Sequence, residues 1–343
     1  MLKEGSLRSV VTGAAGFLGS HLCERLIELG HTVIGLDCFT DYYSPELKKR
    51  NLKNLCRSSR FKFLGLDLTA ADLSHVMRSI DYLFHLAAQP GVRGSWGRDF
   101  EKYVKNNILA TQAVLEALKG TGVKKVIYAS SSSIYGEATA LPTPEETNPR
   151  PISPYGITKL AAENLCHIYR RDFGVPILML RYFTVYGPRQ RPDMAFFRFI
   201  DSALSGSTVV VYGDGNASRD FTYVADAVEA TILAMEKAEP GEIFNVGSGE
   251  PITVNQAISI LEEIVGKEIS VRYEESRHGE VRDTHANINR ARALLGFKPS
   301  KSLHEGLREQ VRWQRCELEV DTGSDRIQAL DAYEDSHPPR RIG

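Results

Sequence analysis

The stretch Thr12-Gly13-Ala14-Ala15-Gly16-Phe17-Leu18-Gly19 decides the fold. It follows an apolar run, Leu7 to Thr12, that is typical of a short buried strand, and it leads into an apolar-periodic helix that Gly30 closes. Residues 31–37 form a second predicted strand. A glycine turn between a strand and a helix lets backbone amides approach a pyrophosphate, because glycines carry no side chain to block it. We therefore predict a phosphate-binding turn at Gly13, Gly16 and Gly19, with Phe17 and Leu18 beside it.

Asp37 stands at the end of the second predicted strand. A carboxylate at about 20 residues beyond the glycine turn is placed to accept a hydrogen bond from the 2′-hydroxyl of an adenine ribose. The next residues, Cys38 and Phe39, supply no arginine for a 2′-phosphate, so the pattern favours NAD over NADP. A solvated loop aspartate is the alternative.

Apolar runs at 61–66, 82–88 and 125–129 alternate with helical patterns such as 99–119. This alternation predicts a parallel sheet covered by helices on both faces, as in a Rossmann-type, doubly wound α/β fold. Ligands of such sheets bind at the carboxyl ends of the strands. The residues expected to line the cofactor cleft are Asp67, Leu68, Leu86, Ala87 and Ala88, and helix 99–119 adds Asn106.

A second polar stretch, Ser131-Ser132-Ser133-Ile134-Tyr135-Gly136, follows the strand 125–129. After a proline-rich loop, Pro154 suits the first position of a helix, which places Tyr155 and Lys159 one turn apart on the same face. A phenol, a cation and several hydroxyls therefore converge beside the cofactor cleft. A free phenol has a pKa of about 10, so Tyr155 needs a nearby positive charge to act as a base near neutrality.

The pattern loosens at 183–194, where Pro, Gly and Arg predict a loop and the start of a second lobe. We predict a Rossmann domain over residues 1–181, to whose sheet segments near 219–247 return as strands. A smaller C-terminal α/β lobe over 182–316 is expected to bind the substrate. Residues 317–343 become acidic and lose apolar periodicity, which predicts a flexible tail.

Composition excludes several kinds of partner. The 343 residues carry 42 Lys and Arg against 43 Asp and Glu, a balance that gives no footprint for nucleic acid or for an anionic membrane. The five cysteines lack CxxC or Cys/His spacing, so we expect no disulfide framework, no metal site and a reducing cytoplasm. No apolar run approaches the roughly 18 residues that a membrane span needs.

With these motifs in place, the chain from about residue 7 to residue 315 resembles the extended short-chain dehydrogenase/reductase family. Further family-like stretches are His85-Leu86-Ala87-Ala88-Gln89, Arg219-Asp220-Phe221-Thr222-Tyr223-Val224 and Phe244-Asn245-Val246-Gly247. The resemblance implies an NAD-retaining enzyme that acts on a nucleotide-linked sugar. Within that family, the 4,6-dehydratases and UDP-glucuronate decarboxylases generally carry an acidic residue where this chain has Ser133, whereas the 4-epimerases carry hydroxyl residues. Epimerisation is therefore the expected reaction.

The run Phe183-Thr184-Val185-Tyr186-Gly187-Pro188, followed by Arg191-Pro192-Asp193-Met194, is similar to that of the UDP-glucuronate 4-epimerases. UDP-glucose 4-epimerases generally place Asn where Thr184 stands. The Arg189-Gln190 pair departs from the Trp-Gly that is commoner in the glucuronate enzymes. The chain looks most like the actinobacterial glucuronate epimerases of antibiotic glycolipid pathways, of the moenomycin type.

The resemblance implies a role for each matching residue. Tyr155 would take the proton of the sugar 4-hydroxyl, Lys159 would lower its pKa and bind the nicotinamide ribose, and Ser131 would bind the same sugar oxygen. Ser132, Ser133 and Thr184 are candidates for gripping the glucuronate carboxylate, and Asn106 lies on the nicotinamide side. Arg219 and Arg277 would reach the diphosphate. The remaining expected substrate contacts are Arg191, Met194, Val211, Tyr212, Glu280 and Arg282. His85 is interpreted as a structural strand-end histidine.

Other functions stay open at this point. A UDP-glucose/UDP-galactose 4-epimerase would turn over the neutral sugar, and a UDP-glucuronate decarboxylase would release carbon dioxide. An NAD-binding regulatory protein would have kept the fold and lost catalysis. The sequence does not separate UDP from dTDP, and the family resemblance implies a homodimer formed through the helices at 99–119 and 155–173.

Overall fold

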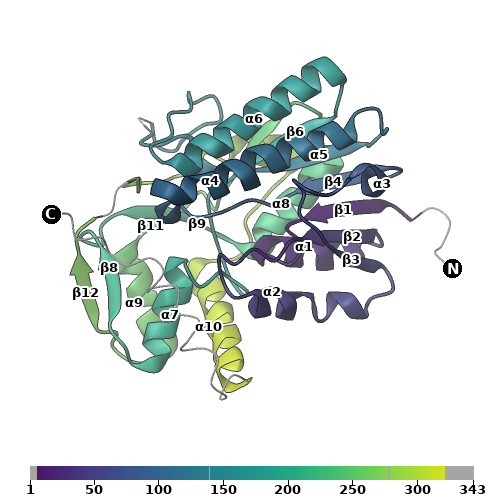
Figure 1. Ribbon diagram of the computed structural model, residues 1–343. Helices are drawn as coiled ribbons and strands as arrows, with labels where there is room; N and C mark the ends of the chain where they lie inside the picture. The colour runs from purple at the N-terminus through teal and green to yellow at the C-terminus, as the bar shows by residue number, and fades with distance from the viewer. Residues whose placement is uncertain (1–5, 139, 277–278, 321–343) are drawn as a thin grey trace.

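A seven-stranded sheet forms the centre of the protein, in the order β10-β6-β5-β4-β1-β2-β3 (Figure 1). The computed structural model describes residues 6–138, 140–276 and 279–320. Every neighbouring pair in this sheet is parallel. The strands are β1 (Arg8–Thr12), β2 (Thr32–Asp37), β3 (Phe61–Gly65), β4 (Tyr82–His85), β5 (Lys125–Ser131), β6 (Ile177–Tyr182) and β10 (Ile243–Val246). The predicted Rossmann-type α/β fold is confirmed.

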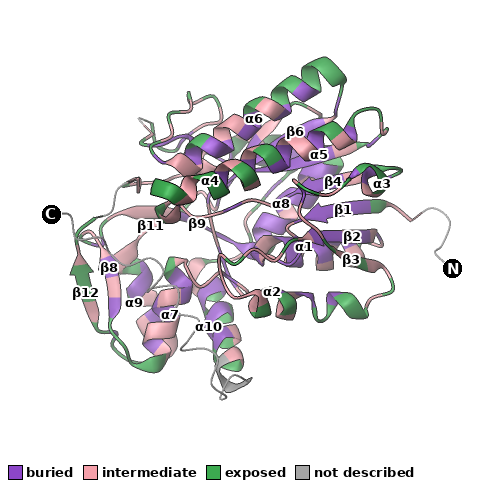
Figure 2. Cartoon of the chain, in the orientation of Figure 1, coloured by how far each residue is buried: buried purple, intermediate pink, exposed green. Residues whose placement is uncertain are grey.

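Successive apolar residues of each central strand enter different cores, because side chains of a strand alternate between the faces of the sheet. Val11 packs with the helices of one face, and Val10 packs with those of the other. The sheet is therefore buried, while the outer faces of the helices are exposed (Figure 2). One face is covered by α1 (Phe17–Glu28) and α8 (Val224–Lys237), and the other by α5 (Ala110–Leu118) and α6 (Pro154–Phe173).

The helix predicted over 99–119 is not continuous. A short helix, α4 (Phe100–Tyr103), passes into a π-helical turn, Val104–Leu109, before α5 begins. A π turn inserts one extra residue per turn and rotates the side chains that follow. The other short helices of this part of the chain are α2 (Pro45–Leu52) and α3 (Ser74–Met77).

The second lobe has its own apolar core, formed by buried residues that include Phe196, Ile200 and Leu261. Phe17, the first residue of α1, belongs to this core, so the helix after the glycine turn contacts both lobes. The elements of the lobe are α7 (Ala195–Ser205), β8 (Val209–Tyr212), α9 (Val254–Val265), β12 (Val271–Glu274) and α10 (Leu303–Val320). Strands β8 and β12 pair in parallel.

Two expectations about this region are corrected. The predicted loop 183–194 contains a strand, β7 (Thr184–Tyr186), and the strand at 219–224 does not return to the main sheet. That strand, β9 (Ser218–Tyr223), instead lies between β7 and β11 (Pro251–Thr253) in a three-stranded sheet. β10 does return and pairs with β6. Pairing with strands distant in sequence decides these positions, which local composition does not reveal.

Helix α10 runs to Val320, so residues 317–320 are helical rather than part of a tail. The rest of the predicted tail, 321–343, lies outside the described residues. The division into domains at residues 181 and 316 stays a prediction.

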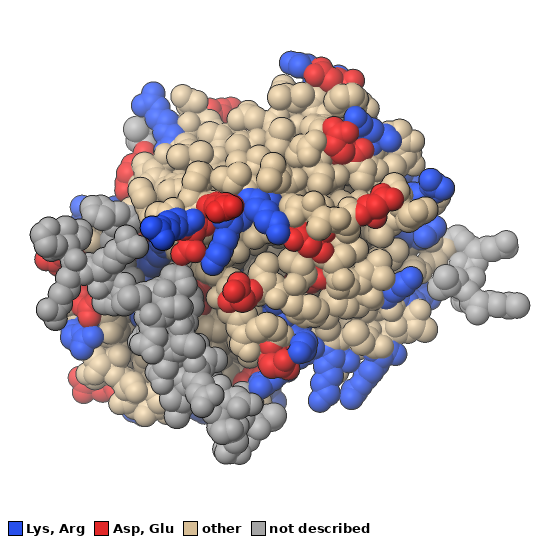
Figure 3. All heavy atoms as spheres, viewed as in Figure 1, with Lys and Arg blue, Asp and Glu red and all other residues tan. Residues whose placement is uncertain are grey.

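The surface carries charged side chains of both signs. On the face shown in Figure 3, basic and acidic side chains are interspersed over the surface. Within the described ranges, no helix is long and apolar enough to cross a membrane. The same residues contain no group of three His, Cys, Asp or Glu side chains that could hold a metal ion. All five cysteines are free.

Candidate active site

The glycine turn joins β1 to α1 at the carboxyl edge of the main sheet. Gly13 has a φ of +71°, and a Cβ there would lie 2.9 Å from the amide nitrogen of Ala87. A Cβ at Gly19 would overlap the carbonyl oxygen of Gly13. Gly16 caps α1 without a side-chain hydrogen bond, which leaves the first helix amides for an anion. The turn therefore fits the pyrophosphate of a dinucleotide.

Asp37 lies beside this turn at the end of β2. Its carboxylate accepts hydrogen bonds from the amides of Phe39 (2.8 Å) and Ala15 (3.3 Å). The ammonium of Lys48, from α2, lies 3.6 Å from Asp37 Oδ1, and both side chains are largely buried. Sequence reasoning searched only the residues that follow Asp37 for a cation and missed Lys48, which the α2 helix brings back to the site.

The other expected cofactor residues follow the neighbouring strands. Asp67 accepts hydrogen bonds from Lys105 (2.7 Å) and from the amide of Thr69 (2.8 Å). Burial raises the pKa of Asp67, but these hydrogen bonds outweigh it, so the pKa is lowered. The amides of Leu86 and Ala87 both donate to Thr12 Oγ1 at 3.1 Å. Leu68 is buried in the core, and Ala88 is half-buried at the strand end.

The π turn contains two adjacent asparagines, Asn106 and Asn107, which differ in burial. Asn106, the predicted cofactor contact, is half-buried. Asn107 is buried and binds the backbone of Gln89 through both its oxygen (2.6 Å) and its nitrogen (3.1 Å). Its nitrogen also donates to Thr158 Oγ1 at 2.9 Å, which joins the end of β4 to helix α6. Sequence reasoning assigned no role to Asn107.

Helix α6 begins as predicted and positions the phenol and the amine. Ser153 accepts a hydrogen bond from the amide of Gly156 (3.1 Å), and Pro154 occupies the first turn. The Ser131 side chain, at the end of β5, lies close enough to Tyr155 to act on its pKa. Burial raises the pKa of Tyr155, while the Ser131 side chain and the charge of Arg191 act in the opposite direction.

Lys159 is buried one turn beyond Tyr155. Its ammonium donates to the backbone oxygen of Ala129 at 2.6 Å and lies 4.9 Å from the centre of the Tyr128 ring. Burial lowers the pKa of Lys159 to about 8, although the charge of Glu163 acts to raise it. The predicted grouping of Ser131, Tyr155 and Lys159 is present at the end of β5.

The serine stretch forms a 3₁₀ turn, Ser132–Ile134. Ser131 Oγ accepts a hydrogen bond from the amide of Ser133 at 3.1 Å, so the first serine caps the turn made by the next two. Ser132 and Ser133 are half-buried. Thr184 is also half-buried and begins β7, directly after Phe183 leaves the main sheet.

Arg191 forms a two-pronged ion pair with Asp193, at 2.9 Å and 3.0 Å. Tyr42 donates to the same carboxylate at 3.2 Å. Asp193 therefore joins the early Asp41-Tyr42-Tyr43 segment to the loop after β7. Met194 is half-buried and donates its amide to the carbonyl of Arg191 (3.1 Å).

Several expected substrate residues of the second lobe form a polar cluster. Arg219 donates to the carbonyl oxygens of Ser218 (2.8 Å) and Arg282 (2.6 Å). Burial lowers the pKa of Arg219, and the charge of Glu280 acts against that effect. Glu280 forms an ion pair with Arg93, whose guanidinium stacks on the Tyr212 ring at 4.4 Å. Arg93 was not predicted as a site residue.

The remaining predicted residues of this lobe are placed differently. Val211 is buried in the core of the lobe. The Arg282 side chain is 76% exposed and its amide donates to Glu137 at 3.1 Å. Arg277 lies outside the described residues. His85, interpreted as structural, is buried and hydrogen-bonds with Thr12 (2.8 Å) and Thr111 (3.0 Å).

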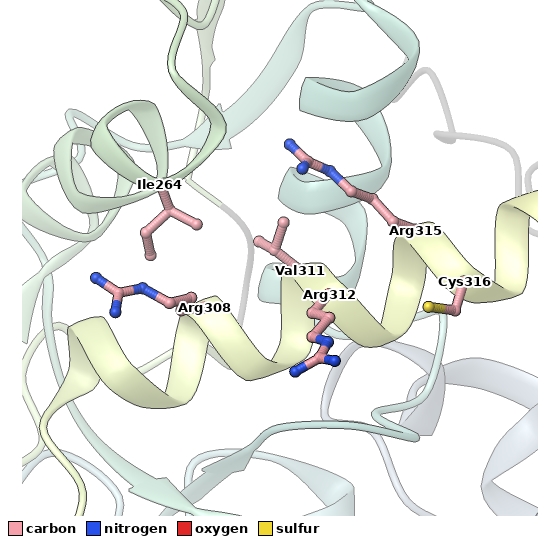
Figure 4. Close-up of a pocket in the computed structure, with 6 residues that line it drawn as sticks. All are labelled: Ile264, Arg308, Val311, Arg312, Arg315 and Cys316. Atoms are coloured by element: carbon pink, nitrogen blue, oxygen red, sulfur yellow. The ribbon is translucent and has the colours of Figure 1, made fainter.

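A shallow pocket of about 270 Å³ lies away from this site, between α9 and α10 (Figure 4). It is lined by Ile264, Arg308, Val311, Arg312, Arg315 and Cys316. None of the residues expected from the motifs lines it, so the strand ends rather than this pocket define the candidate site.

Comparisons with known proteins now place the chain. Residues 9–247 match the family described as the NAD dependent epimerase/dehydratase family. The chain belongs to this family. The predicted relationship and the predicted use of NAD are therefore confirmed. The assignment of the glycine turn and Asp37 to this cofactor stays a prediction.

This chain matches nearly the whole length of individual members of the family. An uncharacterized UDP-glucose epimerase, YtcB of Bacillus subtilis, is 44% identical over 90% of this chain and 98% of its own. The UDP-glucuronate 4-epimerase of Thermodesulfobacterium geofontis is 40% identical over 91% and 97%. The crystal structure of a UDP-glucuronic acid 4-epimerase from Bacillus cereus, in complex with UDP-glucuronic acid and NAD, has a TM-score of 0.89 and 44% identity, covering 91% of this chain and all of that one.

Proposed function

We propose that this epimerase interconverts UDP-glucuronate and UDP-galacturonate by NAD-dependent epimerisation at C4. The observation that carries the proposal is the serine turn after β5, which packs against the start of α6 at Gly156 and has Ser133 in place of a carboxylate. A dehydratase needs an acid or base at that position, and a hydroxyl serves poorly because of its high pKa. Hydroxyl groups can instead bind a carboxylate without repelling it.

Tyr155 is the base of the reaction. In the oxidation step it takes the proton of the sugar 4-hydroxyl, while Ser131 hydrogen-bonds the same oxygen. Bound NAD supplies the acceptor that takes hydride from C4 and returns it to the opposite face of the rotated 4-keto sugar. We assign to Lys159, one helical turn beyond Tyr155 on α6, the positive charge that favours the phenolate. Tyr155 then returns its proton to the new 4-hydroxyl.

The glucuronate carboxylate adds a constraint on the site. Oxidation at C4 makes a β-keto acid, which loses carbon dioxide when the bond from C5 to the carboxylate aligns with the carbonyl π system. We assign the grip on this carboxylate to Ser132, Ser133 and Thr184, which hold the bond out of alignment. Arg219, Tyr212 and Arg93 are assigned to the nucleotide and its diphosphate, because a guanidinium binds two phosphate oxygens and an aromatic ring stacks on a base.

A second candidate is UDP-glucose 4-epimerisation, which the Bacillus subtilis relative's name favours. The test incubates the purified protein separately with UDP-glucuronate, UDP-glucose and UDP-xylose and identifies the products by NMR. We expect UDP-galacturonate from the first, with Tyr155→Phe as the inactive control that still binds NAD. Turnover of UDP-glucose alone would favour the second candidate, and carbon dioxide with a pentose product would indicate a decarboxylase. No turnover, with no change in nicotinamide absorbance, would indicate a regulatory NAD-binding protein.

We also propose a homodimer formed through α5 and α6. Leu109, just before α5, and Ile157 and Phe173 of α6 are 52%, 51% and 52% exposed, so these helices present apolar side chains that a second subunit would cover. Light scattering of the wild type and of Ile157→Glu would test it: a dimer that the variant converts to a monomer is expected, and a wild-type monomer would contradict it. A cytoplasmic setting and a place in antibiotic biosynthesis stay predictions from the sequence.

A further inference from the structure

Arg181, at the end of strand β6, has a buried guanidinium that binds three separate segments. Its Nε and Nη2 atoms donate to the carboxylate of Glu163 at 3.0 Å and 2.9 Å. Its Nη1 atom donates to the Tyr135 hydroxyl at 2.9 Å and to the carbonyl oxygen of Glu145 at 2.8 Å. The two charged side chains are only 5% and 6% exposed, so neither has water as an alternative partner.

Tyr135 extends this network to the last strand of the sheet. Its hydroxyl donates to Asn245 Oδ1 at 2.7 Å, and its ring lies 5.0 Å from the Arg181 guanidinium. The backbone amide of Asn245 donates to Glu145 Oε1 at 2.8 Å, and its side-chain Nδ2 donates to the carbonyl oxygen of Thr143 at 2.9 Å. The hydroxyl of Tyr135 is therefore fixed from two sides.

Each arm of the network reaches a segment that carries a site residue. Tyr135 directly follows the turn of Ser132 and Ser133, and its amide donates to the carbonyl of Ser132 at 3.0 Å. Glu163 lies one turn beyond Lys159 on α6. Glu145 belongs to the loop that leads into α6. Turn and helix also meet directly, because a Cβ at Gly156 would lie 2.5 Å from the carbonyl oxygen of Ser133.

We propose that Arg181 is a positioning residue that fixes the serine turn against α6. It touches no reacting group, but it sets where the turn hydroxyls lie relative to Tyr155. This inference rests on the proposed glucuronate activity, which it deepens. A displacement of the order of 1 Å in a catalytic arrangement can cost about a hundredfold in rate.

Loosening the turn has a specific chemical consequence. The carboxylate of the 4-keto sugar becomes free to rotate until its bond to C5 aligns with the C4 carbonyl. That bond then breaks, its electron pair forms an enolate across C5, C4 and the carbonyl oxygen, and carbon dioxide leaves. The enolate takes up a proton at C5, which gives a UDP-4-keto-pentose, and the hydride removed from C4 stays on the cofactor.

The test compares two buried tyrosines. Tyr135→Phe removes the hydroxyl that binds Arg181 and Asn245 but keeps the ring. Tyr182→Phe is the matched control, because its buried hydroxyl hydrogen-bonds with Thr231 at 2.6 Å and not with Arg181. We expect Tyr135→Phe to lower kcat on UDP-glucuronate roughly tenfold or more and to raise the ratio of decarboxylated to epimerised product severalfold. Tyr182→Phe should stay within about twofold of the wild type in both.

Arg181→Lys is a second test variant, because the lysine keeps a positive charge opposite Glu163 but cannot bind all three segments. Its kcat and product ratio should change in the same direction as those of Tyr135→Phe. The proposal is overturned if both variants match the Tyr182→Phe control in kcat and product ratio, whatever their melting temperatures. If the wild type epimerises only UDP-glucose, the proposed substrate fails separately, and the same comparison of kcat on UDP-glucose decides the role of Arg181.

Discussion

The ammonium of Lys159 is fastened 2.6 Å from the backbone oxygen of Ala129, two residues before Ser131 on the same strand. The cation of helix α6 and the hydroxyl of strand β5 are thus held on one rigid support. The position is buried, and burial lowers the pKa of Lys159 from 10.5 to about 8. Keeping a protonated ammonium at this buried position lowers the free energy of unfolding, and the enzyme retains it because catalysis uses the charge.

Replacing this lysine should therefore separate stability from activity. Between about pH 8 and pH 10.5 the unfolded chain binds a proton that the native Lys159 does not, so this group makes the native state more stable as the pH rises through that window. Below pH 8 its burial costs on the order of 3 kcal/mol, offset in part by the Ala129 hydrogen bond. We expect Lys159→Met to be inactive, more stable than the wild type at pH 7, and without the rise in stability towards pH 10.5. Chemical unfolding at both pH values measures this, and an equal pH dependence in the two proteins would contradict it.

Cofactor choice depends on the pair formed by Asp37 and Lys48. With Asp37 present, its carboxylate neutralises the ammonium 3.6 Å away and repels a 2′-phosphate. We expect Asp37→Ser to weaken NAD binding about tenfold to a hundredfold and to improve NADP binding relative to NAD, because Lys48 becomes free to pair with the phosphate. Titration calorimetry with both cofactors measures the ratio. The double variant Asp37→Ser/Lys48→Gln is the control, and retention of NADP binding there would show that Lys48 is not responsible.

Thr184 should matter only for the charged sugar. If its hydroxyl holds the glucuronate carboxylate, Thr184→Val should raise KM for UDP-glucuronate by about tenfold, the value of one hydrogen bond to a charged group, and release some decarboxylated product. Steady-state kinetics and NMR product analysis follow both effects. UDP-glucose, which has no carboxylate, is the internal control for any residual activity on the neutral sugar. An equal change on both substrates would indicate a general disturbance of β7 instead.

The titration of His85 should make the free energy of unfolding depend on pH in the acid range. Burial, followed by the charge of Lys159, lowers the pKa of His85 from 6.5 to about 3. As the pH falls below about 6.5, the unfolded chain takes up a proton that native His85 refuses, so stability decreases. The contribution lost by pH 5 is roughly 2 kcal/mol. We expect His85→Gln to be less stable at pH 7 but to lose less stability between pH 7 and pH 5 in urea unfolding. A slope equal to that of the wild type would rule out this histidine as a source of acid sensitivity.

The sequence predicts the main sheet well because its strands are continuous apolar runs, which burial on both faces requires. It also predicts the start of α6, since Ser153 and Pro154 are local signals with a local effect. The family relationship followed from the order of the motifs, and the comparisons confirm it.

What sequence reasoning missed depends on contacts between distant segments. Strand β7 exists because Thr184 to Tyr186 pair with Phe221 to Tyr223, which no local pattern reveals. Lys48 and Arg93 look like ordinary surface charges, and only the fold brings them to Asp37 and Tyr212. Arg181, between Leu180 and Tyr182, gave one usable signal: a charge within an otherwise apolar strand needs a buried partner.

The return of β10 to the main sheet has a consequence for synthesis. Its residues pair with β6, although α7, β8, β9 and α8 all lie between the two strands in sequence. The nascent sheet therefore cannot gain its last strand until residue 246 has left the ribosome. By then more than sixty residues that follow Tyr182 have emerged too, including Phe196 and Ile200 of the core to which Phe17 belongs. A chain that ended after residue 181 would lack β10, the neighbour of β6 in the sheet. The cofactor-binding half of this enzyme therefore cannot be transferred to another protein as a separate domain.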